Sequence, residues 1–315
     1  MGCVWYRRAP LFRMLLCGIT TFCIIYIGGD ALRRVQHLRD RPRRRINPDL
    51  IITRNTTKKA TAKATKTGAG LVFCNDTRLM PEGTFPPIAL ASFPGSGNSW
   101  VRHLIKTSTG YATGSVYASK ILRRRGFPGG GEGNLEGRAL TIKTHVFQKN
   151  MVGAILLLRN PYRAMVAEFN RREAGQTGHA PEKEFKTEKW HPYVEEEARN
   201  WIKLYRAFIS ECHHPGNTCK STLIVYYEQL QLHLKDELRR ILEYLNITID
   251  EERLACAVAN AEGTYHRPKR NQTLDPFSKK DRKLVDKSLR LYHDLIVREG
   301  LEKPPLSFSS YPSDL

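Results

Sequence analysis

Short apolar runs alternate with longer amphipathic stretches along the chain from residue 71 onward. The runs with the length and composition of buried strands are residues 87–91, 139–142, 154–158 and 222–227. Apolar positions recur at helical spacing within residues 100–105, 161–169, 194–209, 234–245 and 279–297. Strands that alternate with helices predict an α/β fold of three layers, in which helices flank a parallel sheet.

The first 70 residues have a different character. Residues 14–29 form a run of 16 uncharged, mostly apolar positions. This is slightly short of the ~17–25 residues of a membrane-spanning helix, as suits a thin early-secretory membrane. We therefore expect a cytoplasmic tail at 1–13, a transmembrane signal-anchor at 14–30, a basic stem at 31–70 and a globular domain at 71–315. A cleaved signal peptide is the alternative, because small residues at 27–31 suit a cleavage site.

Charge is concentrated near the start of the chain. The 315 residues carry a net charge of +20, and residues 1–66 hold 15 Lys and Arg against three Asp, or +12. Residues 33–70 are also poor in aromatic side chains and cannot bury a core, so this segment is predicted to be a tether. The remainder is moderately basic and has no nucleic-acid reading module, which favours an anionic ligand over a nucleic-acid partner.

Two signals disagree about the side of the membrane on which the domain lies. More arginines follow the apolar segment than precede it, and this distribution alone favours a cytosolic domain. Four glycosylation sequons favour the lumen instead, and they begin at Asn55, Asn75, Asn246 and Asn271. Four of the seven cysteines also lie beyond the apolar segment. We expect a single-pass type II protein with a luminal domain.

The late cysteines fall into two natural pairs. Cys212 and Cys219 flank a turn-rich loop that a disulfide can staple, which leaves Cys74 and Cys256 as a second pair. A zinc site is the alternative, because His213 and His214 stand beside two of these cysteines. Adjacent histidines are a poor ligand spacing, and no metal is expected.

A Gly/Ser-rich segment at residues 93–100 follows the first predicted strand and opens into a helix. It reads Phe-Pro-Gly-Ser-Gly-Asn-Ser-Trp. Strand, loop and helix in this order point backbone N–H groups at an anion, and the helix dipole adds positive charge there. The fold is therefore expected to be P-loop-like. The segment is not a Walker A motif, because Gly97 is followed by Asn98 and Ser99 and not by Lys and Ser or Thr.

Polar residues follow two other predicted strands and lie where ligands bind in parallel sheets. Lys143 and His145 come after the strand at 139–142, and Arg159 follows the strand at 154–158. A histidine there can remove a proton, a lysine can stabilise negative charge, and a guanidinium can bind a phosphate. Arg267 and Lys269 belong to a later basic cluster. Residues 111–138 form an irregular insert, either a loop over the site or a solvated connector.

Taken in order, these motifs resemble the sulfotransferases that use 3′-phosphoadenosine 5′-phosphosulfate (PAPS). The resemblance covers residues 86–270: a strand with a PxxGxxW loop, Lys-Thr-His, a strand ending in Arg-Asn-Pro, Tyr-Tyr-Glu and a basic loop. The form of the loop, Arg-Asn-Pro-Tyr and the membrane anchor are most similar to the WSC-domain-containing group, the sialate O-sulfotransferases. The cysteine-rich WSC modules are absent here.

The resemblance implies a role for each matching residue. The 5′-phosphosulfate would be bound by the loop residues Gly95, Ser96, Gly97, Asn98, Ser99 and Trp100. Arg159 would bind the 3′-phosphate, Tyr227 and Tyr265 the adenine, and Arg267 and Lys269 the phosphates from a closing loop. His145, or less favourably Glu168, would be the catalytic base beside Lys143. The implied protein is a Golgi membrane sulfotransferase with a glycan acceptor of anionic character, such as sialic acid.

The implied reaction is an in-line displacement. His145 takes the proton of the acceptor hydroxyl as its oxygen attacks sulfur, Lys143 and loop amides hold the sulfonyl oxygens, and 3′,5′-ADP leaves. Two positions depart from the family pattern. The loop lysine after Pro94 is Gly95, and the serine expected eight positions after Arg159 is Ala167. Lys143 or Arg102 would then supply the missing charge.

Two other functions stay open on the sequence. A P-loop small-molecule kinase is disfavoured by the missing Gly-Lys-Ser/Thr and by the lack of an obvious magnesium-binding Asp at a strand end. A catalytically impaired relative that binds a nucleotide or glycan is the second, motivated by Gly95 and Ala167. The sequence does not fix the oligomeric state.

Overall fold

The computed structural model describes residues 66–67, 70–71, 74, 76–118, 123–124, 127, 136–263, 267, 275–309 and 311–312. The predicted tail, the predicted membrane anchor and most of the predicted stem lie outside these residues. Within the described ranges, no helix combines the length and apolar character needed to cross a membrane.

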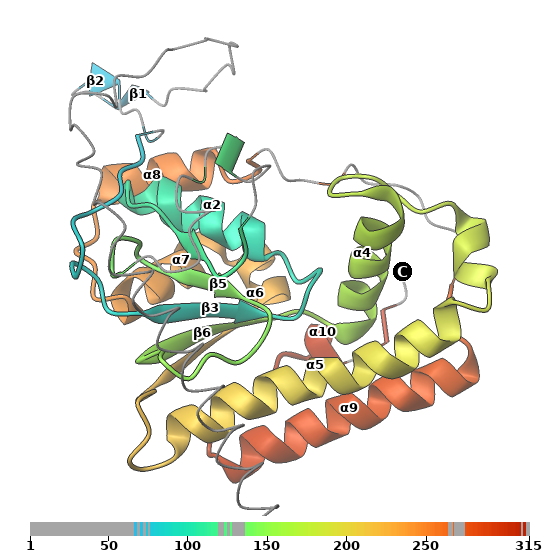
Figure 1. Cartoon of the computed structure of the whole chain (residues 1–315). Helices are drawn as coiled ribbons and strands as arrows, with labels where there is room; N and C mark the ends of the chain where they lie inside the picture. The colour runs from blue at the N-terminus through green and yellow to red at the C-terminus, as the bar shows by residue number, and fades with distance from the viewer. Residues whose placement is uncertain are drawn as a thin grey trace, which may run out of the picture. The chain divides into compact units, whose positions relative to one another are not determined.

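A five-stranded parallel sheet organises the described domain (Figure 1). Its order is β4-β5-β3-β6-β7, and every neighbouring pair is parallel. The strands are β3 (Ile88–Ser92), β4 (Gly114–Ser115), β5 (Ile142–Thr144), β6 (Gly153–Leu158) and β7 (Thr222–Tyr226). The predicted α/β fold with a parallel sheet and flanking helices is confirmed. Two further strands, β1 (Lys66–Thr67) and β2 (Gly70–Leu71), pair with each other in antiparallel fashion.

The two central strands are buried on both faces, and their side chains alternate between two hydrophobic clusters. In β6, Leu156 and Leu158 join the cluster under α5 and α9, whereas Ile155 and Leu157 join the cluster under α2, α7 and α8. This is the period of two expected of a strand between two helical layers. Figure 1 shows the same division, with α2 and α8 over one face of the sheet and α5 and α9 over the other.

The helices begin and end where local chemistry favours it. They are α2 (Asn98–Thr109), α4 (Pro161–Ala174), α5 (Trp190–His213), α6 (Tyr227–Leu232), α7 (Leu234–Tyr244), α8 (Glu251–Ala259), α9 (Lys279–Arg298) and α10 (Leu306–Ser309), with the 3₁₀ helix η2 at Glu182–Lys186. The Asn160 side chain accepts hydrogen bonds from the first turn of α4, and Pro161 occupies its first position, as predicted. Ser278 and Asp281 form a capping box at the start of α9.

Two predicted boundaries near site residues are wrong, and one short strand was not predicted. The apolar run at 139–142 is buried, but the strand begins only at Ile142 and continues through Thr144. Lys143 therefore lies within β5 rather than after it. Tyr227 is not the last residue of β7 but the first of α6. The irregular insert contains the short edge strand β4, whose two residues are too few to give a periodic signal.

Both expected cysteine pairs are joined as disulfides. Cys74 bonds to Cys256 in α8 across a sequence separation of 182, and Cys212 bonds to Cys219 across a separation of seven. The long-range bond is accompanied by an ion pair of 2.7 Å between Arg253 and Asp76. Together they fix the segment that precedes the sheet to α8.

Candidate active site at the carboxyl edge of the sheet

The loop between β3 and α2 lies where the strand order reverses. From β3 the chain passes through α2 to β4 and β5 on one side, and then to β6 and β7 on the other. In open parallel sheets, ligands bind outside the carboxyl ends of the strands at such a point. The loop, His145 and Arg159 all follow strands at this edge.

The first turn of α2 offers backbone donors to this edge. Gly97 precedes the helix in a left-handed conformation, with φ of 90°, and no side chain caps the helix. The N–H groups of Trp100 and Val101 both donate to the carbonyl of Gly97, at 2.9 and 3.1 Å. The N–H groups of Asn98 and Ser99 consequently have no helical partner. Together with the helix dipole they suit an anion.

The loop is packed so closely that its two glycines have no room for a side chain. A Cβ atom on Gly95 would lie 2.3 Å from the Ala164 carbonyl oxygen in α4, and one on Gly97 would lie 2.6 Å from the Tyr227 ring. Both residues have positive φ, of 81° and 90°. The position at which the resemblance would place a lysine is therefore closed in this protein, because α4 lies directly against it.

Two predicted ligand-binding side chains are used to hold the loop in place. The Asn98 amide donates to the Leu90 carbonyl at 3.0 Å and to the Ser92 hydroxyl at 3.1 Å, so it ties α2 to β3. The Trp100 indole donates to the Ala261 carbonyl at 2.7 Å. Ser96 is buried in the loop, and Ser99 is partly exposed. The loop therefore faces a ligand mainly with backbone groups.

His145 lies immediately after β5 and has one defined tautomer. Its Nδ1 lies 2.7 Å from the carbonyl oxygen of Ser92, the last residue of β3. A carbonyl oxygen only accepts hydrogen bonds, so Nδ1 carries the proton and Nε2 keeps a lone pair. Burial lowers the pKa of His145 to about 4, with the charge of Lys143 as a further cause. The imidazole is thus neutral near pH 7, as a general base must be.

Lys143 precedes His145 by two residues in β5. Burial lowers the pKa of Lys143 to about 8, and the charges of Arg102 and Arg171 act in the same direction. Arg102 is itself fully buried and donates to Thr113 through its Nε and Nη2 atoms, at 3.0 and 2.8 Å. Lys143 and Arg102 were the two residues expected to replace the missing loop cation. Arg102 is bound to Thr113, so Lys143, next to His145, is the better candidate.

Arg159 links β6 to the loop. Its Nη1 donates to the Gly95 carbonyl at 2.8 Å, and its guanidinium lies over the Tyr227 ring at 4.5 Å. Its Nε is buried and has no hydrogen-bond partner within the described part of the chain. Buried donors are normally satisfied, so this atom is available to a bound group. Burial raises the pKa of the neighbouring Glu228, whose carboxylate accepts the Asn160 N–H at 2.9 Å.

Arg267 brings a second guanidinium to Arg159. It donates to the Ala167 carbonyl in α4 at 3.2 Å, and its buried Nε likewise lacks a partner among the described residues. Burial lowers the pKa of Arg267, and the charge of Arg159 is the next cause. Two neighbouring guanidinium groups that oppose each other's charge suit an anion bound between them. The other residues of the closing loop, Tyr265 and Lys269, lie outside the described residues.

Glu168 is a poor candidate for the base. It is buried in α4, and its carboxylate accepts two hydrogen bonds of 2.6 Å from Arg171 and one of 3.0 Å from Arg172. The pKa of Glu168 is lowered on balance, because these arginine contacts outweigh the opposing effect of burial. Its structural role is to hold Arg171 near Lys143 and His145.

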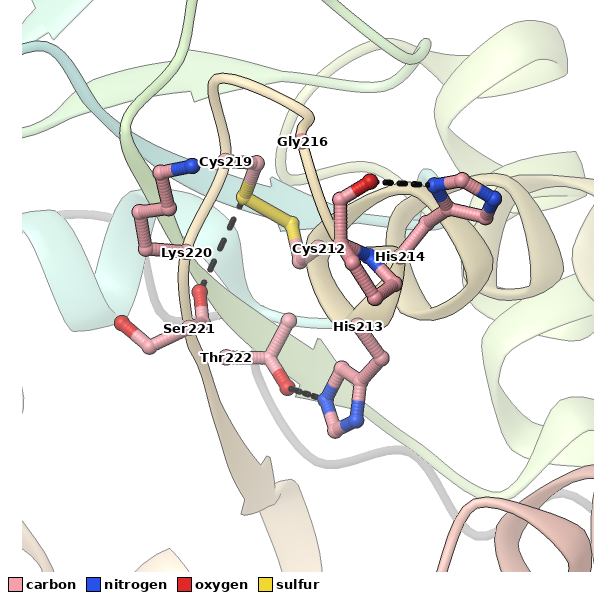
Figure 2. Close-up of a pocket in the computed structure, with 9 residues that line it drawn as sticks. Cys212, His213, His214, Gly216, Cys219, Lys220, Ser221 and Thr222 are labelled. Atoms are coloured by element: carbon pink, nitrogen blue, oxygen red, sulfur yellow. Dashed lines mark hydrogen bonds between the residues drawn. A yellow bond between two sulfur atoms is a disulfide. The ribbon is translucent and has the colours of Figure 1, made fainter.

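A shallow cavity of about 480 Å³ lies at the opposite, amino-terminal edge of the sheet, where α5 ends and β7 begins (Figure 2). The Cys212–Cys219 disulfide crosses it, so neither sulfur is a free thiolate for a metal. His213 contacts the Thr222 hydroxyl at 3.0 Å, and His214 contacts the Pro215 carbonyl at 2.8 Å. Across the described residues, no three His, Cys, Asp or Glu side chains gather as metal ligands.

Comparison with known proteins identifies relatives over about two thirds of the chain. The chain is 36% identical over 218 residues to WSCD family member GA21586 of Drosophila pseudoobscura pseudoobscura and 35% identical over 218 residues to WSCD family member CG9164 of Drosophila melanogaster. Each match covers 67% of this chain and 66% of the relative. The chain is homologous to WSCD family members. The match spans just under two thirds of these relatives' own length, and no family model matches the chain.

Solved structures with a similar arrangement include two PAP complexes. Mouse sulfotransferase SULT7A1 complexed with PAP aligns with a TM-score of 0.44 at 16% identity, over 69% of this chain and 85% of that structure. Retinol dehydratase in complex with androsterone and the inactive cofactor PAP aligns with a TM-score of 0.40 at 14% identity, over 69% of this chain and 82% of that structure.

Sequence reasoning missed three residues that shape the site. Arg171 is one; it lies three residues after Glu168 in α4, but beyond the stretch at 161–169 that was predicted to be helical. Ser92 was not singled out although it ends the first strand, because its contribution is a backbone carbonyl. Tyr117 stacks on His145 from within the irregular insert, where no pattern marked it.

The close packing at Gly95 gives a direct test. Gly95→Ala is expected to lower the free energy of unfolding by roughly 1–3 kcal/mol more than Gly83→Ala, because only the first adds overpacking to backbone strain. Gly83 is the matched control, since its φ of 76° is similar and nothing lies within 4 Å of its added Cβ. Urea unfolding of the two variants measures the difference. Equal losses would show that α4 does not close the loop.

Proposed function

We propose that this protein is a PAPS-dependent sulfotransferase that transfers the sulfuryl group to a hydroxyl of a glycan. The observation that carries the proposal is a set of groups at one sheet edge: the uncapped start of α2, a neutral His145 with a free lone pair, Lys143, and the paired cations Arg159 and Arg267. The order of motifs along the chain, which resembles that of sulfotransferases, supports the same function.

The available donors fit a nucleotide with an anionic group at each end. The N–H groups at the start of α2 would bind the 5′-phosphosulfate, as helix termini bind phosphates elsewhere. The unpartnered Nε atoms of Arg159 and Arg267 would bind the 3′-phosphate. Tyr227 lies between the start of α2 and Arg159, with its ring under the Arg159 guanidinium. It would contact the adenine.

The chemistry that these residues support is a direct displacement at sulfur. The acceptor oxygen forms a bond to sulfur as the bond from sulfur to the phosphate oxygen breaks, and 3′,5′-ADP leaves. His145 accepts the hydroxyl proton at Nε2, because Nδ1 already carries a proton that it donates to Ser92. Lys143 stabilises charge on the sulfonyl oxygens, in place of the lysine that the closed loop excludes. The leaving group is a phosphate and needs no metal.

The acceptor and the location belong to the proposal. A glycan of anionic character, with sialic acid as the first candidate, suits the resemblance to sialate O-sulfotransferases. Glycan acceptors are reached in the Golgi lumen, and two disulfides suit that oxidising compartment. We propose a type II membrane protein of the Golgi, anchored through residues 14–30, with its described domain in the lumen.

Binding of 3′,5′-ADP and transfer of labelled sulfate test the function. The purified full chain is expected to be stabilised against heat by 3′,5′-ADP and not by ATP with magnesium, and to transfer sulfate from PAPS to sialylated glycans. Arg159→Ala should weaken 3′,5′-ADP binding about 10–100-fold, because it removes hydrogen bonds to a charged phosphate. Arg199→Ala, in an exposed pair with Glu195, is the control.

The outcomes of these measurements separate the rival functions. Stabilisation by ATP with magnesium alone would favour a kinase. Binding of 3′,5′-ADP without transfer to any glycan would favour an impaired, nucleotide-binding relative. Transfer that survives in His145→Ala would refute the assigned base.

The pH dependence of kcat/KM for PAPS tests the two site residues, since it reports pKa values of the free enzyme. His145 must be neutral and Lys143 charged, and their pKa values are about 4 and about 8. The rate constant should be level between about pH 5 and 7 and fall as pH rises through about 8, when Lys143 loses its proton. Lys143→Arg should move the alkaline fall to higher pH. An unchanged alkaline limb would count against Lys143.

Glycosylation at Asn246 tests the topology. This sequon lies in an exposed turn just after α7, where Asn246 has a left-handed φ of 53°. The full chain expressed in cells should lose apparent mass on endoglycosidase treatment, and Asn246→Gln should remove one glycan. Thr84, which belongs to no sequon, provides an Ala variant as the control. A chain that carries no glycan would contradict a luminal domain.

A further inference from the structure

Besides the Ser92 carbonyl, His145 is contacted by an aromatic residue that the catalytic scheme does not use. Its neighbour Tyr117 follows β4, the edge strand of the sheet. We propose that Tyr117 is a positioning residue for His145: it fixes the orientation of the imidazole so that Nε2 faces the acceptor hydroxyl. The inference rests on the proposed function, because it assigns how that function's base is oriented.

Two separate contacts join these residues. The Tyr117 hydroxyl accepts a hydrogen bond of 3.0 Å from the backbone N–H of His145. The two rings are stacked, with 5.5 Å between their centroids and 28° between their planes. One side chain therefore restrains both the backbone and the ring of the base.

The edge strand β4 places Tyr117 at this position. Ser115 pairs with Lys143 in the parallel ladder, and the Val116 N–H donates to the Lys143 carbonyl at 3.0 Å. The buried Ser115 hydroxyl then accepts the Tyr117 N–H at 3.1 Å. Because β4 is paired to β5, the strand that carries Lys143, Tyr117 lies beside His145, which immediately follows that strand.

With Tyr117 in place, the imidazole has restraints on two sides. Ser92 fixes Nδ1 through its carbonyl, and Tyr117 covers one face of the ring. A half-turn of the ring about Cβ–Cγ would put Cδ2 where Nδ1 lies and Cε1 where Nε2 lies, so the bond to Ser92 would be lost and a carbon would face the acceptor. The charged groups around the ring are Lys143 in β5 and Glu168 and Arg171 in α4.

The exposure of Tyr117 argues against a role in the core. Tyr117 is 38% exposed and belongs to neither hydrophobic cluster of the described domain, and its hydroxyl and its ring both contact His145. Replacement of Tyr117 should therefore leave the fold intact and change the base. Val146, which directly follows His145 in the chain and is 53% exposed, provides the control variant.

The experiment compares Tyr117→Leu, Tyr117→Phe and Val146→Ala in the full chain. Tyr117→Leu should lower kcat about tenfold or more without changing the binding of 3′,5′-ADP, because a loosely held base spends less time aligned. Tyr117→Phe keeps the stacked ring and should recover most of that loss. Val146→Ala should match the wild type.

Nitrogen NMR of the His145 ring gives a readout that does not depend on activity. The signal is assigned from its absence in His145→Ala. The wild type should show one neutral tautomer with the proton on Nδ1, whereas Tyr117→Leu should show a mixture of tautomers and a higher pKa, closer to the ordinary value of about 6.5.

These readouts separate the inference from the proposed function. An unchanged tautomer and an unchanged kcat in Tyr117→Leu would overturn the inference even if the wild type transfers sulfate. A changed tautomer in Tyr117→Leu, in a protein that transfers nothing, would support the positioning role while the proposed function fails.

Discussion

The close contact between the loop at residues 93–97 and helix α4 is the constraint on which the site depends. Gly95 lies so near the Ala164 carbonyl that no side chain fits, and its own carbonyl accepts a hydrogen bond from Arg159. The loop is thereby fixed by α4 and by Arg159, which follows β6. Its N–H groups, and not a loop lysine, are left to meet an anion.

This constraint redistributes positive charge within the site. With no cation in the loop, the charges come from Lys143 in β5, Arg159 after β6 and Arg267 in a later segment. Glu168 is neutralised by Arg171 and Arg172 and so does not cancel them. Cations that share a small, partly buried volume oppose each other, and a ligand with two anionic groups relieves that repulsion. This distribution of charge matches the two anionic groups of the proposed nucleotide.

The sequence predicted the sheet well because its central strands are buried on both faces and read as uninterrupted apolar runs, as at residues 154–158. The prediction missed β4, which has only two residues. It placed β5 too early, because the buried Leu140 lies in an apolar run that precedes the strand. For the site, the sequence was sufficient to predict Arg159 and His145 as candidate residues, because both follow predicted strands. It could not name Ser92 or Tyr117, because a backbone carbonyl and a ring placed by an edge strand leave no pattern in the chain.

The Cys74–Cys256 disulfide reaches the site through α8. Just beyond that helix, the Asn260 carbonyl lies 2.9 Å from His103, and the Ala261 carbonyl accepts the indole N–H of Trp100 at 2.7 Å. Both partners belong to α2, the helix whose first turn faces the sheet edge. Reduction would release α8 from the segment before the sheet and loosen the support behind that first turn. The disulfide thus supports the proposed anion site indirectly, through the packing of α8 against α2, although both sulfur atoms lie outside that site.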